Sequence, residues 1–409
     1  MKRLFLLLIT YQLLLISAQA QNINGTWNGE LNAGLQKIPL VLNLTADGKC
    51  TLDSPQQGAK GIPANVHFLS ADSLSISVSS LNAAYSARLQ DGELKGAFTQ
   101  NGFKLPLNLK PGKRAAANRP QTPKPPYPYE TEEVTFTNTK ASAKLAGTLT
   151  MPKNAKCVLL MVTGSGQQNR DEELFEHKPF AVIADYLARQ GIATLRYDDR
   201  AFGASTGGDV TNATTKDFAD DALAGIEWLR AQKRFKRVGI LGHSEGGTIA
   251  FMLGAQKKVD FIVSLAGTAV KGDSIILEQN KALGGPMAAG LTMEQLYALP
   301  AIKKAINENA WYRYFMEYDP QTEIRQIKCP VLALNGSKDL QVIANQNLSA
   351  LRRTLPKHKH TLIKQYDDLN HLFQHCQTGL PTEYGQIEET ISEEVLKDIA
   401  NWIHARACA

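Results

Sequence analysis

The chain has 409 residues, of which 43% are hydrophobic and 21% charged. This balance is typical of a globular protein, and it excludes a disordered chain, a collagen-like repeat and a disulfide-dense miniprotein. The formal charge of +6 is not concentrated in one stretch, so the sequence predicts no nucleic-acid partner. At about 150 residues per domain, the length indicates two or three domains.

The first twenty residues have the pattern of a signal peptide. Two basic residues precede an almost wholly apolar run at 4–16, and Ala18 and Ala20 form an A-x-A cleavage site. The apolar run is shorter than the roughly 20 residues that span a bilayer. We therefore expect cleavage before Gln21, no membrane anchor after cleavage, and a periplasmic or secreted protein.

Five cysteines are present, and an odd number leaves at least one unpaired in an oxidising compartment. None has metal-ligand spacing, so we expect no metal and no cofactor. Cys157 and Cys329 each open an apolar run and are expected in the core.

Residues 21–110 are expected to form a small all-β accessory domain. Alternating stretches at 26–31, 38–44, 74–78, 84–89, 93–98 and 104–109 are separated by the turn dipeptides Asp47-Gly48, Asp91-Gly92 and Asn101-Gly102. This spacing is typical of a meander, a sandwich or a barrel. Trp27, His67 and Tyr85 are candidates for a ligand surface, although core packing is the simpler interpretation.

Residues 111–129 contain six of the 18 prolines among polar residues, at 111, 120, 123, 125, 126 and 128. Such a segment favours extended polyproline conformation and builds no core, so it is interpreted as a Pro-rich linker.

From 130 to 409 strands alternate with helical stretches, which predicts a mostly parallel sheet with helices on both faces. The expected strands are 157–162, 193–195, 238–241, 261–265 and 331–334, and the expected helices are 178–189, 215–231, 246–253 and 391–405. The alternation lapses at about 268–326, a stretch rich in Met and aromatic residues. We interpret this stretch as a helical lid insertion.

The pattern G-x-S-x-G occurs at 242–246, between an apolar strand and a helix. A serine hydroxyl is a weak nucleophile unless it projects toward a base, and a sharp strand-to-helix turn provides that projection. Gly242 and Gly246 allow the turn, so Ser244 is the predicted nucleophile. The amide of Glu245, at the helix start, is a predicted oxyanion donor.

The expected acid and base follow later strands. Asp339 comes after the strand at 331–334, and His371 comes on the loop after a last strand at 361–366. The order Ser, Asp, His is that of α/β-hydrolases. The weaker candidates are Asp273, Asp367 and Asp368 for the acid, and His358, His360 and His375 for the base.

The second oxyanion donor is expected on the loop 162–171, whose two glycines allow close approach to a carbonyl. The amide of Ser165 is favoured, and those of Gly166 and Gln167 are the alternatives. The later stretch 197–203 is interpreted as structural, with an Arg–carboxylate pair that fixes loops near the site.

The motifs GSGQQNRD at 164–171, RYDDRAFGAS at 196–205, GHSEGG at 242–247, NGSKD at 335–339 and NHLF at 370–373 resemble the α/β-hydrolase superfamily. Within it, the chain is most similar to exported bacterial serine esterases and the related serine aminopeptidases. The resemblance covers about 130–409 and implies Ser244, Asp339 and His371 as the triad, with Ser165 and Glu245 at the oxyanion positions. The family often has His-Gly at 163–164 and Arg-Gly at 200–201, where this chain has Thr-Gly and Arg-Ala.

These features predict an α/β-hydrolase fold with an N-terminal all-β domain, acting as a serine hydrolase of small or sugar-linked acyl esters. A serine aminopeptidase is the alternative, and Glu172, Glu173 and Glu176 are then candidates to bind a free amino terminus. A non-catalytic carbohydrate-binding protein is the second alternative. The sequence leaves homodimerisation open.

Overall fold

The computed structural model describes residues 23–33, 36–55, 59–100 and 102–407. The chain divides into two compact units: the first extends to Ala117 and includes Leu174–Glu176, and the second contains Asn118–Glu173 and His177 onward. The predicted signal peptide lies outside the described residues. Within the described ranges, no helix has the length and apolar character needed to cross a membrane.

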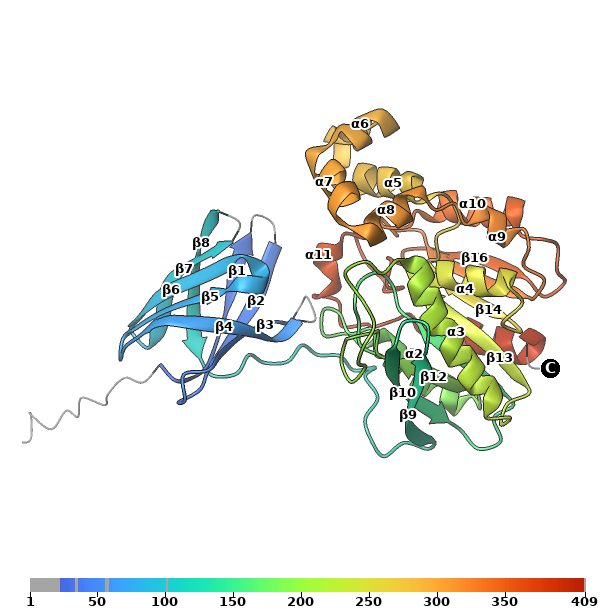
Figure 1. Ribbon diagram of the computed structural model, residues 1–409, viewed down its shortest axis with the longest axis horizontal. Coiled ribbons are helices and arrows are strands. Elements are labelled where there is room, and N and C mark those ends of the chain that lie inside the picture. Colours follow the sequence, from blue (N-terminus) through green and yellow to red (C-terminus); the bar gives the residue numbers. More distant parts are fainter. Residues whose placement is uncertain (1–22, 34–35, 56–58, 101, 408–409) are drawn as a thin grey trace, which may run out of the picture. The chain divides into compact units, whose positions relative to one another are not determined.

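The first unit is a closed eight-stranded antiparallel barrel (Figure 1). Neighbouring strands pair in chain order, and β1 pairs with β8 to close the barrel. A short 3₁₀ turn, η2 (Ser79–Leu81), connects two of the strands. The strands are β1 (Gly25–Ala33), β2 (Gln36–Leu44), β3 (Cys50–Ser54), β4 (Ala59–Leu69), β5 (Ser73–Val78), β6 (Ala83–Gln90), β7 (Glu93–Gln100) and β8 (Phe103–Pro111).

The barrel interior is filled by side chains. Trp27 and Tyr85 are buried, and their polar atoms donate hydrogen bonds to the backbone carbonyls of Ile23 and Leu94. His67 is exposed and contacts Ser77 on the next strand. Trp27 and Tyr85 are therefore core residues rather than a ligand surface.

Two barrel strands, β3 and β4, have no counterpart among the expected strands. β4 contains Gly61 and Pro63, and its residues are mostly exposed or half-buried, so it lacks the apolar alternation that marks a strand. Closure of the barrel imposes the extended conformation there.

The Pro-rich segment is divided between the units. β8 ends at Pro111, and residues from 118 onward belong to the second unit. Arg119 donates hydrogen bonds to the carbonyls of Gly385 and Ile387, and Gln121 donates one to the carbonyl of Ile391. Arg119 and Gln121 thus hold this part of the segment on the second unit through hydrogen bonds.

The second unit is built on an eight-stranded sheet in the order β16-β15-β14-β13-β11-β12-β10-β9. Strands β11 to β16 are parallel, and β9 and β10 add an antiparallel edge. The bounds are β9 (Glu130–Asn138), β10 (Ala143–Met151), β11 (Cys157–Val162), β12 (Ala193–Tyr197), β13 (Arg237–His243), β14 (Ile262–Leu265), β15 (Val331–Gly336) and β16 (Leu362–Tyr366).

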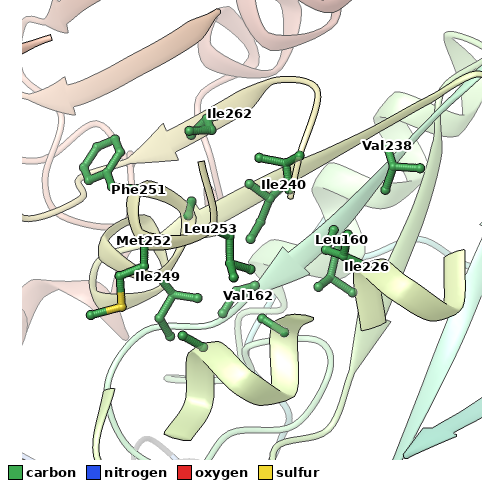
Figure 2. Close-up of a cluster of buried hydrophobic side chains, with 14 of the residues drawn as sticks. Leu160, Val162, Ile226, Val238, Ile240, Ile249, Phe251, Met252, Leu253 and Ile262 are labelled. Atoms are coloured by element: carbon green, nitrogen blue, oxygen red, sulfur yellow. The ribbon is translucent and has the colours of Figure 1, made fainter. Parts of the chain in front are cut away.

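Helices cover both faces of this sheet, as expected. One hydrophobic cluster joins the sheet to α3 (Thr215–Ala231), α4 (Glu245–Ala255) and α10 (Ala344–Thr354). A second cluster joins it to α2 (Pro179–Arg189) and α12 (Glu393–Trp402). Figure 2 shows the first cluster, where α4 presents Ile249 and Leu253 to Ile240 of the central strand β13.

The region expected to hold a lid is helical. It contains α5 (Gly272–Gly284), η3 (Gly285–Met287), α6 (Met293–Ala298), α7 (Pro300–Glu308), α8 (Ala310–Glu317) and α9 (Gln321–Ile324). The chain ends with α11 (Pro381–Tyr384), α12 and a π-helical turn, η4 (Ile403–Ala407). In Figure 1, α5 to α8 stand together beyond one end of the sheet.

The buried Cys157 is disulfide-bonded, so it has a covalent role besides the packing role expected from the sequence. Cys50, Cys329 and Cys376 carry free thiols. Burial raises the pKa of Cys50 and of Cys329 to about 11, so both thiols are protonated at neutral pH.

Candidate active site

Ser244 stands at a sharp turn between β13 and α4. Its backbone has φ 53° and ψ −118°, a conformation that few non-glycine residues adopt. The turn is held by hydrogen bonds from Ser244 N to Leu265 O and from Gly247 N to Ser244 O. The strained backbone places a half-buried serine between a strand end and a helix start, as the sequence predicts.

The two glycines of the motif are required by close packing. A Cβ on Gly242 would lie 2.0 Å from the carbonyl oxygen of Gly246, and a Cβ on Gly246 would lie 2.1 Å from that of Val162. Neither position tolerates a side chain, because the helix start packs directly on β13 and β11.

Asp339 and His371 are paired in the interior. Asp339 Oδ2 lies 2.8 Å from His371 Nδ1, and both side chains are buried. Asp339 Oδ1 accepts hydrogen bonds from the amides of Gln341 and Val342, each at 2.8 Å. The two amides therefore fix the carboxylate, and its other oxygen orients the imidazole through Nδ1.

The nucleophile turn and the His371 loop lie at one edge of the sheet. β13, β15 and β16 run parallel, so Ser244, Asp339 and His371 follow strands that end on the same side. The ring of His243, next to Ser244, packs against the His371 ring with 4.7 Å between centroids. In the resting geometry of the described residues, no hydrogen bond joins Ser244 Oγ to His371.

The weaker candidates occupy other surroundings. His375 is exposed and pairs with Glu389. His358 and His360 lie before β16 and contact each other. Asp273 lies in α5 and binds Lys271 and Tyr297, while Asp368 pairs with Lys338 on the surface. Of these histidines and acids, only His371 and Asp339 are joined in a buried pair.

Two amides are positioned to hold an oxyanion. Glu245 N is the first amide of α4, and such amides have no partner within a helix. Gly164 lies so close to Ser244 that a Cβ would be 3.3 Å from that of the serine, which places the amide of Ser165 beside the nucleophile turn. Among the described residues, neither Ser165 N nor Glu245 N donates a hydrogen bond.

The Glu245 side chain links the nucleophile turn to the helical insertion. Its Oε1 accepts hydrogen bonds from Thr215 Oγ1 at 2.6 Å and from Trp311 Nε1 of α8 at 2.7 Å. Burial raises the pKa of Glu245, and these hydrogen bonds only partly oppose the rise.

His243 and Glu172 form a second buried pair, which the sequence analysis did not identify. His243 Nδ1 lies 2.9 Å from Glu172 Oε1, and His243 Nε2 lies 3.0 Å from the carbonyl oxygen of His371. The same Glu172 oxygen accepts the amide hydrogen of Gly164 at 2.9 Å. Burial lowers the pKa of His243, but the Glu172 carboxylate, together with the carbonyl of His371 and the charge of Asp339, more than offsets this, so the pKa is raised.

The glutamates considered for binding a substrate amine have protein partners. Glu172 is occupied by His243 and Gly164, Glu173 pairs with Lys178, and Glu176 pairs with Arg114. The sequence suggested these three acids by their place near the loop, but it could not show where each carboxylate points.

The stretch 197–203 is structural, as expected. Asp198 pairs with Arg170 at 2.9 Å, and the buried Arg200 donates to Asp221 at 2.7 Å. Ala201, where the resembling family often has glycine, has φ 53°. The family's glycine therefore matches a left-handed backbone position.

The site shows no donor set for a metal: in the ranges that the structure describes, no three His, Cys, Asp or Glu side chains gather as metal ligands would.

The chain is similar to several known hydrolases. The family model Hydrolase_4, described as serine aminopeptidase S33, matches residues 176–322, a range that contains the nucleophile turn but not Asp339 or His371. Esterase EstD of Thermotoga maritima is 28% identical over 291 residues, which is 68% of each chain. The solved Pyrococcus furiosus esterase PF2001 is 19% identical and covers 73% of this chain and 100% of its own, with a TM-score of 0.47.

Proposed function

We propose that the chain is a serine esterase of the α/β-hydrolase kind, which hydrolyses small or sugar-linked acyl esters with a Ser244–His371–Asp339 triad. The observation that supports the triad is that the hydrogen-bonded, buried Asp339 and His371 lie at the same edge of the sheet as the strained Ser244.

In the proposed mechanism, His371 Nε2 takes the proton of Ser244 Oγ as that oxygen attacks the ester carbonyl carbon. Asp339 accepts from His371 Nδ1, so it orients the ring and stabilises the imidazolium. His371 then gives the proton to the departing alcohol oxygen. Water, deprotonated by His371, attacks the acyl-enzyme and releases the carboxylic acid and free Ser244.

The amides of Ser165 and Glu245 are proposed to hold the oxyanion of each tetrahedral intermediate. Both lie beside Ser244 and are free to donate, and Glu245 N has the positive end of the α4 dipole behind it.

The helices α5 to α8 are proposed to form the lid that selects the substrate. α8 reaches the nucleophile turn through Trp311, and Trp311 stacks on Phe315 with 5.4 Å between centroids. An aromatic wall near the nucleophile suits an acyl or aromatic group of moderate size.

Peptide hydrolysis is the alternative that the family model's description raises. An aminopeptidase needs a free carboxylate to bind the substrate amine, and the three glutamates suggested by the sequence are engaged with protein groups. Ester hydrolysis needs no such group, so the site favours it.

Export to the periplasm or the medium is proposed from the N-terminal sequence pattern. The disulfide at Cys157 supports it, since disulfides persist in oxidising compartments. N-terminal sequencing of the exported protein should give Gln21, and an intact Met1 would contradict the proposal.

The function is tested with a panel of p-nitrophenyl esters and acetylated sugars against aminoacyl anilides. The wild-type chain should hydrolyse the esters and leave the anilides intact, and Ser244→Ala should lower kcat by about four to six orders of magnitude. Near-full ester hydrolysis by Ser244→Ala would reject the triad. Anilide cleavage at a rate similar to ester cleavage would instead support the peptidase. If neither class reacts, the non-catalytic alternative is favoured.

A further inference from the structure

The ring of His243 has a hydrogen-bond acceptor at each nitrogen. Nδ1 faces a carboxylate oxygen of Glu172, and Nε2 faces the carbonyl oxygen of His371, at 2.9 and 3.0 Å. A neutral imidazole has one N–H, so it would leave one nitrogen lone pair against an oxygen lone pair. Only the doubly protonated ring donates both hydrogen bonds.

The Glu172 carboxylate stabilises a positively charged His243 in the protein interior. His243 is 7% exposed and Glu172 is 1% exposed, so an unpaired charge on either would be costly. The two together form a neutral pair in which each group has hydrogen-bonded partners. The charged groups facing His243 are Glu172 after β11, Asp339 after β15 and the titratable ring of His371 after β16.

The pair touches all three loops of the site. His243 precedes Ser244, and its Nε2 lies within hydrogen-bond distance of the carbonyl oxygen of His371. Its partner Glu172 accepts a hydrogen bond from the amide of Gly164, which is next to Ser165. We propose that His243 is a doubly protonated positioning residue, which with Glu172 forms a charged brace between the nucleophile turn, the oxyanion loop and the His371 loop. Only the kinetic consequence of this inference, and not the protonation of His243, rests on the proposed function.

The brace predicts an upper pH limit for catalysis. Because Glu172 raises the pKa of His243, the ring keeps both protons to a higher pH than a free imidazole does, and it loses one as pH rises through that raised value. One of the two hydrogen bonds is then lost. The His371 backbone is no longer fixed, and kcat should fall with alkaline pH while KM changes little.

The variant Glu172→Gln tests the charge without changing the shape. Glutamine keeps an oxygen that accepts from Gly164 N and His243 Nδ1, but it no longer favours the imidazolium. We expect the alkaline limb of kcat to move down by about one pH unit or more. The matched control is Glu389→Gln, which removes the carboxylate from the exposed His375 pair and should leave the profile unchanged.

A direct measurement does not depend on catalysis. Nitrogen NMR of the wild-type protein, labelled at histidine and assigned with His243→Gln, should show both His243 nitrogens protonated at neutral pH. A single-protonated His243, or a Glu172→Gln profile that superimposes on the wild type, would overturn the brace. Absence of ester hydrolysis by the wild type would reject the proposed function instead, and the NMR result would still decide the state of His243.

Discussion

At the scale of single residues, the site depends on a few backbone positions that only one kind of residue can occupy. Gly242 and Gly246 were identifiable from the sequence because their spacing around Ser244 is a local property of a tight turn. Glu172 and His243 were not identifiable as a pair, because they are 71 residues apart and meet only through the sheet. Neither pattern nor spacing reports a contact of that kind.

Asp339→Asn should lower kcat by about 10⁴-fold: the asparagine oxygen would stay on the amides of Gln341 and Val342, so its NH2 group would face His371 Nδ1, make that nitrogen an acceptor and leave the proton on Nε2. The measurement is steady-state kinetics on a short ester. An activity within about tenfold of the wild type would show that Asp339 is not the acid of the triad.

Ala201→Gly should stabilise the protein by about 0.5–1 kcal/mol, because Ala201 has φ 53° and glycine adopts this conformation without strain. Urea unfolding of the full chain measures the change. Ala204→Gly, at a nearby position outside the left-handed region, is the control and should be destabilising. Equal effects of the two substitutions would contradict the strain at 201.

At the scale of elements, helices and buried strands were well predicted where burial gives a strong pattern. The helix α3 begins and ends as expected, because its buried residues have helical spacing after a capping box, and β11 does too, because it is continuously apolar. β9 and β10, which form the antiparallel edge, were not assigned as strands, since their alternating residues lie beside a linker. The insertion was expected to be helical, but its link to Glu245 through Trp311 depends on packing that no local pattern reveals.

Glu245→Gln should make stability less dependent on pH. A carboxyl group whose pKa is raised by burial contributes stability that is present below its ordinary value of 4.5 and lost as pH rises through the raised value. Glutamine keeps an acceptor for Thr215 and Trp311 and stays neutral. The Tm of the variant relative to the wild type should therefore increase from about pH 4 to about pH 8. A constant difference across this range would contradict the buried, proton-linked state of Glu245.

At the scale of the whole molecule, the chain is two units with separate cores. The barrel has its own hydrophobic cluster, and the two clusters of the α/β unit lie on either face of its sheet. The sequence predicts the change from all-β to α/β at the Pro-rich segment, because strand spacing and proline content differ between the two parts. It could not choose between a sandwich and a barrel, since closure depends on the pairing of β1 with β8.

A chain that begins at Asn118 should therefore fold and keep a kcat/KM on short esters within about threefold of the full chain. Calorimetry of the full chain should show two transitions, of which the shortened chain keeps one. A shortened chain that is unfolded by circular dichroism, or a single transition for the full chain, would show that the units depend on each other.

The central claim is that the Ser244 hydroxyl is activated by His371, and covalent labelling with a fluorophosphonate tests it most directly. Mass spectrometry of the digested wild-type protein should find the label on Ser244, with labelling slowed by at least about 10³-fold in His371→Ala. Labelling at another residue, or an unchanged rate in His371→Ala, would contradict the account.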